Sequence, residues 1–356
     1  MKKLFRPLLL SAAFISFLAS CSDNNTIAPA PTGGSGQYAF VINEGNYTNG
    51  TGSVSRFDKN TKALTVDAFG SANKGAVLGS VVQSMGIIGT TGYVVVNNSN
   101  KIEVVSLPDF KSKATISGLN QPRYFLQSPT NLLKGYVTEW LGGPAPAPYT
   151  AGRVSFIDLT TNKVTGSVPV GTNPERMAVV NGILYVANSS SSFLSAISDA
   201  NGGPIGTVAL PSPASEIVVD KNNSMWVLCG SDYGSQPATL LHFNAAPNSM
   251  NIQQRFAFPS ASAGGGGLRI SPDGQQLYYG YGQGEYRMSI TDTALPTTPL
   301  IPRSFYGFDI DPTTGQLYAT DALNYSSPGR LIRYQPNGTK LDSATVQVSP
   351  NGVVFY

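Results

Sequence analysis

Short apolar runs of four to six residues, separated by turn signals, make up most of this chain. Residues 174–210 show the pattern most clearly, with four such runs divided by Asn-Gly, a serine-rich segment and Gly-Gly-Pro. Runs of this length between turn residues are typical of β-strands. A four-stranded unit this small cannot bury both of its faces alone, so we expect it to pack against further units of the same kind.

The unit recurs along the chain, and each copy is marked by an aromatic residue near the start of its second strand. Successive markers lie 40 to 55 residues apart, with a mean of about 47, a spacing typical of propellers with one sheet per repeat. The seven markers are Tyr38, Tyr93, Tyr136, Tyr185, Trp226, Tyr278 and Tyr318.

The two ends of the repeat region complement each other. A Pro/Gly/Ser-rich tract precedes Tyr38 where the other units have a first strand, and a spare apolar strand, 352–356, follows the seventh unit. Pairing the two would close a ring and leave only short sheet edges. We therefore predict an all-β fold, a seven-bladed β-propeller of four-stranded blades over residues 38–356, closed by a C-terminal strand that completes the N-terminal blade.

The first 37 residues have a different composition. Residues 1–20 contain a basic start and an apolar run from Leu8 to Leu18, which predicts a secretory signal peptide too short to span a membrane in the mature protein. The following Leu-Ala-Ser-Cys resembles the lipobox of bacterial lipoproteins, which implies lipidation of Cys21; an ordinary signal peptide cleaved nearby is the alternative. Residues 21–37 read as a flexible tether.

Charge argues against a nucleic-acid partner. The sequence has 23 Lys and Arg and 20 Asp and Glu, but three of the basic and none of the acidic residues precede Cys21, so 20 of each remain after cleavage. No run of basic residues supports binding to a polyanion.

The sequence offers little for catalysis. His242 is the single histidine and falls mid-strand in the fifth unit, away from the expected ring axis, which argues against a Ser-His-Asp triad or a histidine metal site. The glycine-rich segment 263–268 and the alternating glycines Gly280, Gly282 and Gly284 lack the helix that a phosphate-binding loop needs. Cys229 reads as a small buried residue. We predict no catalytic residue, no metal and no cofactor.

Side chains that follow the second strand of each unit converge on one face of a propeller, and here they are mainly amides and aromatics with few unpaired charges. Turn chemistry explains any one of them, but the set suits a bulky polar ligand held by hydrogen bonds and ring contacts. The predicted ligand-binding residues are Asn43, Glu44, Asn46, Tyr47, Asn97, Asn98, Glu139, Trp140, Asn188, Tyr233, Tyr281, Asp321 and Tyr325.

Several stretches resemble known exported propellers. Tyr-Val-Ala-Asn at 185–188, with Thr-Asn-Pro-Glu before it, is similar to YVTN-type β-propeller repeats. Residues 40–46, 99–104, 121–124 and 318–329 are similar to surface-lipoprotein propellers of Bacteroidetes that include the cobalamin-capturing partners of TonB-dependent transporters. The resemblance implies a protein anchored in the outer membrane through Cys21, facing the cell exterior. It would capture a small-molecule nutrient, with cobalamin as the first choice, and pass it to a TonB-dependent outer-membrane transporter without catalysis.

Two other functions stay open at this point. One is an adhesion or protein-assembly propeller module. The other is a calcium-dependent lactonase-like hydrolase, for which Glu44, Glu139, Asn188 and Asp321 offer the oxygen ligands that a hard cation prefers.

Overall fold

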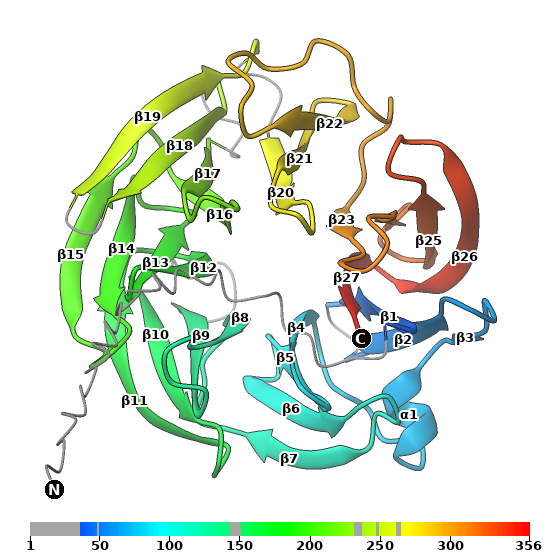
Figure 1. The fold of residues 1–356 in the computed structure, drawn as a ribbon. Coiled ribbons are helices and arrows are strands. Elements are labelled where there is room, and N and C mark those ends of the chain that lie inside the picture. The colour runs from blue at the N-terminus through cyan, green and yellow to red at the C-terminus, as the bar shows by residue number, and fades with distance from the viewer. Residues whose placement is uncertain (1–35, 48–49, 143–150, 231–236, 247–248, 261–264) are drawn as a thin grey trace, which may run out of the picture.

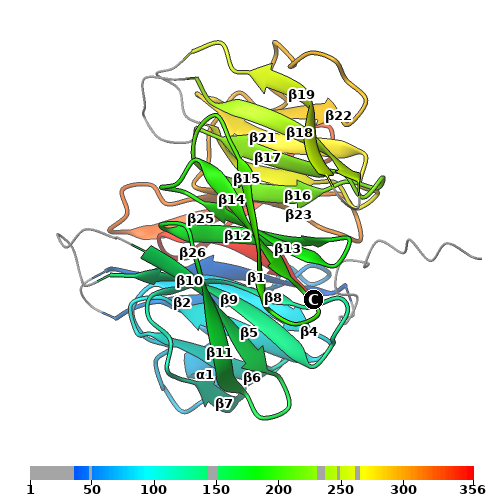
Figure 2. The ribbon, with the colours of Figure 1, turned by 90° about the vertical axis from the view of Figure 1, so that its left-hand side faces the viewer.

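Seven antiparallel sheets surround a central axis in the computed structural model of the chain (Figure 1). The structure describes residues 36–356 except 48–49, 143–150, 231–236, 247–248 and 261–264. The predicted signal peptide, Cys21 and all of the tether before residue 36 lie outside these residues, and so does Tyr233. The view turned by 90° shows the strands running between the two faces of the ring (Figure 2).

Each sheet is one blade, and its strands follow one another outward from the axis. The innermost strands are β27 (Pro350–Phe355), β4 (Val82–Ile88), β8 (Pro122–Gln127), β12 (Pro174–Val180), β16 (Ala214–Val219), β20 (Gly265–Ile270) and β23 (Gly307–Ile310). The second strands are β1 (Tyr38–Asn43), β5 (Thr91–Val96), β9 (Lys134–Leu141), β13 (Ile183–Asn188), β17 (Met225–Cys229), β21 (Gln276–Tyr281) and β24 (Leu317–Asp321). The third strands are β2 (Ser53–Asp58), β6 (Lys101–Ser106), β10 (Ala151–Asp158), β14 (Phe193–Ser198), β18 (Thr239–Ala246), β22 (Gly284–Ser289) and β25 (Pro328–Tyr334). The outermost strands are β3 (Leu64–Thr65), β7 (Ser112–Ile116), β11 (Lys163–Val170), β15 (Pro204–Ala209), β19 (Ser249–Ala257) and β26 (Lys340–Val348).

The sixth blade, β20 to β22, has three strands where four were expected. Residues 290–306 pass along its outer edge, but they form only an isolated bridge between Glu285 and Ile301. This segment contains Pro296, Pro299 and Pro302. Because proline has no backbone N–H to donate, the segment cannot continue the ladder.

The C-terminal strand completes the first blade as predicted. β27 pairs with β1 in antiparallel register, with Phe40 opposite Val354 and Val41 opposite Val353. Tyr38 and Tyr356 add a reciprocal pair of backbone hydrogen bonds at the end of the ladder. The ring is therefore closed by pairing between segments more than 300 residues apart in the sequence.

The cores lie between blades. The described residues form seven apolar clusters, and each joins two consecutive blades. Each aromatic marker belongs to a different cluster; Trp226 and Tyr318, for example, are fully buried. This explains the repeat, since every blade needs one large side chain to fill the gap to a neighbour.

Only one helix, α1 (Ala68–Ala72), occurs among the described residues. Asp67 caps it by accepting a hydrogen bond from the backbone N–H of Gly70 at 3.0 Å. No helix in this part of the chain is long and apolar enough to cross a bilayer.

The described chain enters the first blade at one face of the ring. Gln37 donates a side-chain hydrogen bond to Asp58 at 2.8 Å. Its backbone carbonyl accepts a hydrogen bond from the backbone N–H of Lys59. Asp58 ends β2 and lies opposite Tyr38, at the far end of the hairpin from Asn43 and Ser53. The C mark in Figure 2 lies at this same end of the first blade.

Candidate functional site

The ends of the second strands share one face of the ring with the starts of the innermost strands. Asn43 lies opposite Pro350, Glu139 opposite Pro122, and Asn188 opposite Pro174. We call this the site face. The described members of the predicted set follow or end second strands, so they lie on or near it.

Four of the predicted residues are buried and bonded within the internal framework of the described structure. Asn43, Glu139 and Asn188 have no exposed area, and Asn97 is 9% exposed. Asn43 donates to Ser55 Oγ at 3.0 Å, and Asn188 donates to the carbonyl of Phe193 at 2.9 Å. The side-chain amides of Asn43 and Asn188 are thus occupied by contacts within their own blades.

Glu139 and Asn97 illustrate what such residues do. Glu139 forms an ion pair with Arg153 at 2.8 Å and accepts hydrogen bonds from Ser155 Oγ and the backbone N–H of Asn120. Asn97 follows β5 in the second blade and donates to the carbonyl of Pro122 in the third at 3.0 Å. These polar side chains therefore hold strands and blades together.

A second group joins the first and second blades at the rim. Ser80 Oγ donates to the carbonyl of Tyr47 at 2.9 Å and accepts from Asn98 Nδ2 at 3.0 Å. The backbone N–H of Asn46 donates to Thr51 Oγ1 at 2.9 Å. Tyr47 is 56% exposed, so its side chain is available to a ligand.

A further polar cluster on the site face is centred on Glu44. Tyr306 donates its hydroxyl to Glu44 Oε2 at 2.9 Å, and Asn351 Nδ2 donates to Glu44 Oε1 at 2.8 Å. The ring of Tyr325 lies 5.1 Å from that of Tyr306 at 89°, an edge-to-face contact. We call these four residues the Glu44 corner. Burial of the hydroxyl, with the Glu44 carboxylate beside it, raises the pKa of Tyr306 above its usual range.

Charged side chains from five of the seven innermost strands, β8, β12, β16, β20 and β23, form a series of ion pairs, and we call this set the axial ring. Its members are Arg123, Glu175, Arg176, Glu216, Arg269 and Asp309. Arg269 reaches Asp309 at 2.6 Å and Glu216 at 3.2 Å, and Arg123 reaches Glu175 at 3.0 Å. Apart from Arg176, these side chains are at most 16% exposed, so the charges are largely desolvated and satisfy one another.

Gln83 connects the axial ring to the Glu44 corner, and Trp140 packs against the axial ring. The Arg123 guanidinium lies over the Trp140 ring at 4.0 Å and donates to Gln83 Oε1. The backbone carbonyl of Gln83 accepts from Asn351 Nδ2 at 3.0 Å. Trp140 Nε1 donates to the carbonyl of Pro174 at 3.2 Å. A continuous set of contacts thus runs from Tyr325 across the site face to Trp140.

The remaining predicted residues lie apart from this set. Asp321 pairs with Arg303 and accepts from the backbone N–H of Leu323 at 2.9 Å. Tyr281, in the sixth blade, accepts from the backbone N–H of Ser260 at 2.8 Å and packs on Phe258, which follows the last strand of the fifth blade. Glu44, Glu139 and Asp321 therefore have separate partners. No group of three or more His, Cys, Asp or Glu in the described part of the chain is placed to hold a metal ion.

His242 lies in β18, two strands from the axis, as its place in the sequence suggested. Its ring stacks on Trp226 with centroids 4.1 Å apart, and burial lowers its pKa despite Asp220 at 3.8 Å. Cys229 is fully buried.

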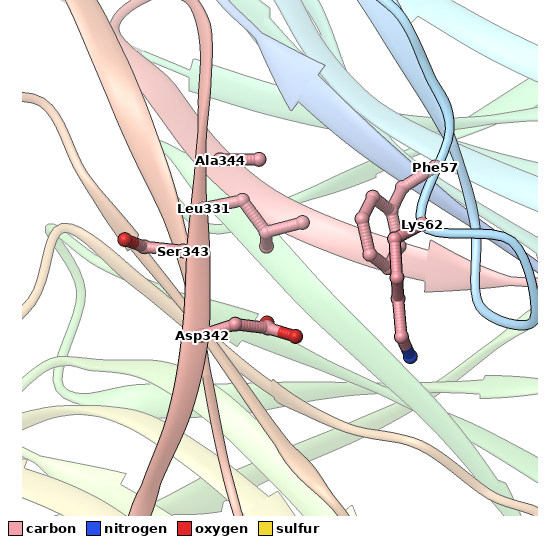
Figure 3. Close-up of a pocket in the computed structure, with 6 residues that line it drawn as sticks. All are labelled: Phe57, Lys62, Leu331, Asp342, Ser343 and Ala344. Atoms are coloured by element: carbon pink, nitrogen blue, oxygen red, sulfur yellow. The ribbon is translucent and has the colours of Figure 1, made fainter.

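Two pockets lie away from the site face. One, of about 260 Å³, opens between the β2–β3 turn and β26, with Phe57, Leu331 and Ala344 as its apolar part and Lys62 and Asp342 at its edge (Figure 3). The other, of about 490 Å³, lies along β15 and β19. Neither contains a predicted site residue.

Comparison with known proteins places the chain in a family. Residues 37–347 match the family model described as "Domain of unknown function (DUF5074)", so the chain belongs to this family of β-propellers. A comparison with the functionally curated proteins finds no match.

Solved structures with the same fold have diverse names. A functionally unknown protein from Desulfotomaculum acetoxidans has a TM-score of 0.66 at 12% identity, covering 90% of this chain and 98% of that one. The periplasmic gluconolactonase of Pseudomonas aeruginosa also has a TM-score of 0.66 at 12% identity, covering 89% and 99%. A quinoprotein alcohol dehydrogenase-like protein from Bacteroides thetaiotaomicron has a TM-score of 0.64 at 15% identity, covering 90% and 78%. At such identities the likeness shows the fold alone.

The sequence analysis missed the axial ring and half of the Glu44 corner. Tyr306 and Asn351 precede or begin innermost strands, whereas the predicted residues all follow or end second strands. The signal that could have found the ring is the recurrence of a charged residue within the first strands, as in Pro-Arg at 122–123 and Pro-Glu-Arg at 174–176.

Proposed function

We propose that this protein is a ligand-capture propeller that binds a bulky polar nutrient on its site face and catalyses no reaction. The observation that carries the proposal is the continuous set of side chains from Tyr325 through Glu44 to Trp140. It combines exposed aromatic rings with hydrogen-bonding groups across the seventh, first, second and third blades. Ring faces and a few polar groups on a rigid scaffold are what a large polar ligand needs.

The ligand class follows from the chemistry of this surface. The axial ring satisfies its own charges, so a ligand that lies across the face need not neutralise them. Tyr47, Tyr306 and Tyr325 are 56%, 42% and 55% exposed and offer apolar ring surface. A corrinoid such as cobalamin, with a broad macrocycle edged by amides, is the first candidate, and the resemblance of the sequence to cobalamin-capturing propellers supports it.

Cellular placement is part of the same proposal. A lipid on Cys21 would hold the protein in the outer membrane, with the propeller on the cell exterior beside a TonB-dependent transporter that receives the ligand. Incorporation of labelled palmitate, lost in Cys21→Ser, tests the anchor. Protease treatment of intact cells tests the exterior placement. Slower nutrient uptake by cells that lack this protein but retain the transporter tests the partnership.

Binding is tested by equilibrium dialysis of the full chain, purified in detergent, against cobalamin, cobinamide and a panel of ferric siderophores. We expect one class to be retained unchanged, without a reaction product. Tyr325→Ala and Trp140→Ala should each weaken retention roughly tenfold, because each removes a large contact surface. Leu132→Ala is the matched control, since Leu132 is 66% exposed in the turn after β8, on the opposite face.

The outcomes separate the parts of the proposal. Retention of a siderophore but no corrinoid would replace the ligand and keep the capture function. If no member of the panel is retained, or if both site variants retain ligand as well as Leu132→Ala does, the site face is not a nutrient-binding surface.

A further inference from the structure

Two tyrosine rings at a right angle form one part of the Glu44 corner, and a carboxylate forms another. The rings of Tyr306 and Tyr325 stand at 89° to each other with centroids 5.1 Å apart. Both rings remain about half exposed, so part of their surface is free to receive a ligand group. Tyr306 also carries the hydroxyl that donates to Glu44, which places the carboxylate at the hydroxyl end of the Tyr306 ring.

The Glu44 carboxylate differs from the axial carboxylates in its bonding partners. Glu175, Glu216 and Asp309 each pair with arginine, whereas within the described residues no cationic side chain forms an ion pair with Glu44. Its two described side-chain partners, Tyr306 and Asn351, are neutral donors. Arg123 lies within electrostatic range, but its guanidinium already bonds Glu175 and Gln83.

The loop that carries Tyr325 has an energetically unfavourable backbone conformation. Leu323 and Tyr325 have φ angles of 54° and 60°, in the left-handed region that bulky residues rarely adopt. Asp321 Oδ1 accepts from the backbone N–H of Leu323, and Asn324 Oδ1 accepts from the backbone N–H of Ser326 and of the next residue. Because these bonds fix the loop while its two large side chains stay about half exposed, the loop presents them outward.

We propose that the Glu44 corner binds a substituted ammonium group. An organic cation is attracted to the faces of aromatic rings and to a carboxylate, and its alkyl groups lose little hydration on contact with the rings. The perpendicular rings of Tyr306 and Tyr325, with the Glu44 carboxylate at the Tyr306 hydroxyl, supply both attractions within one corner of the face. This inference rests on the proposed function only in placing a ligand on the same face. It concerns one group, carried by the nutrient or bound independently of it.

The direct test compares two probes of equal shape. Choline carries a trimethylammonium group, and 3,3-dimethylbutan-1-ol replaces it with a neutral tert-butyl group. In ligand-observed NMR titrations of the full chain we expect saturable binding of choline and roughly fivefold or greater weakening for the alcohol, since only the cation gains from the charge and the ring faces. Equal binding of both probes, or binding of neither, overturns the proposal.

Variants then locate the binding. Glu44→Gln keeps the shape and an acceptor for the tyrosine hydroxyl, and it should weaken choline roughly fivefold without changing the alcohol. Tyr325→Leu should weaken choline, whereas Tyr325→Phe, which keeps the ring, should bind within about twofold of the native protein. Asp273→Asn, in the turn after β20 on the opposite face, is the matched charge control.

The comparison of probes on the native protein needs no variant, so misfolding of a variant leaves the test decisive. If Glu44→Gln and Asp273→Asn bind choline equally well, the cation binds elsewhere and the corner is excluded. Failure of every nutrient in the dialysis panel would refute the proposed function without touching this result, because neither probe is a nutrient of that panel.

Discussion

Glu285 offers a quantitative test of how the sixth blade is built. This glutamate lies in β22 with 3% of its surface exposed, and its Oε2 has no hydrogen-bond partner. Burial raises the pKa of its carboxyl from 4.5 to about 8, although Arg269 and the backbone N–H of Phe305 favour the ionised form. The folded protein therefore holds a proton here that the unfolded chain has lost at neutral pH.

The sign and size of the effect follow from linkage. Because the folded pKa is the higher one, the contribution of Glu285 to stability is complete below about pH 4.5 and is lost as pH rises to about 8. One pKa unit corresponds to 1.36 kcal/mol, so the full loss is on the order of 5 kcal/mol. That is a large share of the 5 to 15 kcal/mol typical of a folded domain.

The assay is urea unfolding, followed by tryptophan fluorescence, of the native protein and Glu285→Gln between about pH 5 and pH 9. Glutamine is nearly isosteric and stays neutral, so the variant should show less loss of stability with pH. We expect the native protein to lose roughly 3 to 4 kcal/mol more than the variant between pH 5 and pH 8. The other titrating groups contribute equally to the free energy of unfolding of both proteins, so their contributions cancel when the two values are subtracted. Parallel curves for the two proteins would refute the reasoning, because they would mean that Glu285 ionises in the fold without penalty.

Three further predictions test the ring and its closure. Arg269→Met leaves Glu216 and Asp309 without their shared cation and should cost about 3 kcal/mol in urea unfolding; Arg303→Met, which breaks a more exposed pair, should cost less than about 1 kcal/mol. A chain ending at Ser349 lacks β27 and should unfold at lower urea, with partial recovery when a peptide of residues 350–356 is added. Burial raises the pKa of the Cys229 thiol to about 12, so a thiol reagent at about pH 8 should label it only in denaturant.

Each of these has a clear contrary result. Equal costs for the two arginine variants would mean that the axial ring contributes no more than a surface pair. An unchanged midpoint after removal of β27 would show that the first blade is stable without closure. Rapid labelling of Cys229 in the native protein would show that the fifth blade opens readily.

The blade count and the closure could be predicted because they are encoded locally. Tyr185 and Trp226 each follow a turn and precede a short apolar run, and every blade must repeat this arrangement to pack on its neighbours. The spare strand at 352–356 had to pair with something, and the first blade lacked a strand. The absence of a fourth strand in the sixth blade was not predicted, although Pro296, Pro299 and Pro302 indicate it.

The site was harder to predict because burial depends on partners from other blades. Asn43 and Asn188 looked like turn residues near a ligand, but each bonds a strand of its own blade. Arg269 has an ordinary sequence context, and only the ring brings it to Glu216 and Asp309 from the neighbouring blades. The Glu44 corner likewise needs Tyr306, which lies 262 residues further along the chain.

The entry of the chain at Gln37 and Tyr38 has a geometric consequence for the proposed anchor. β1 separates this entry from the site face by six residues, about 20 Å. If a lipid holds Cys21 in the membrane and the entry face points toward it, Glu44 and the site face would point away from the membrane, where they can contact ligands in the medium. Transfer of the ligand to a transporter in the membrane would then require the propeller to rotate so that its site face points toward the membrane. The 16 residues between Cys21 and Tyr38 span about 50 Å when fully extended, which is long enough to allow this rotation.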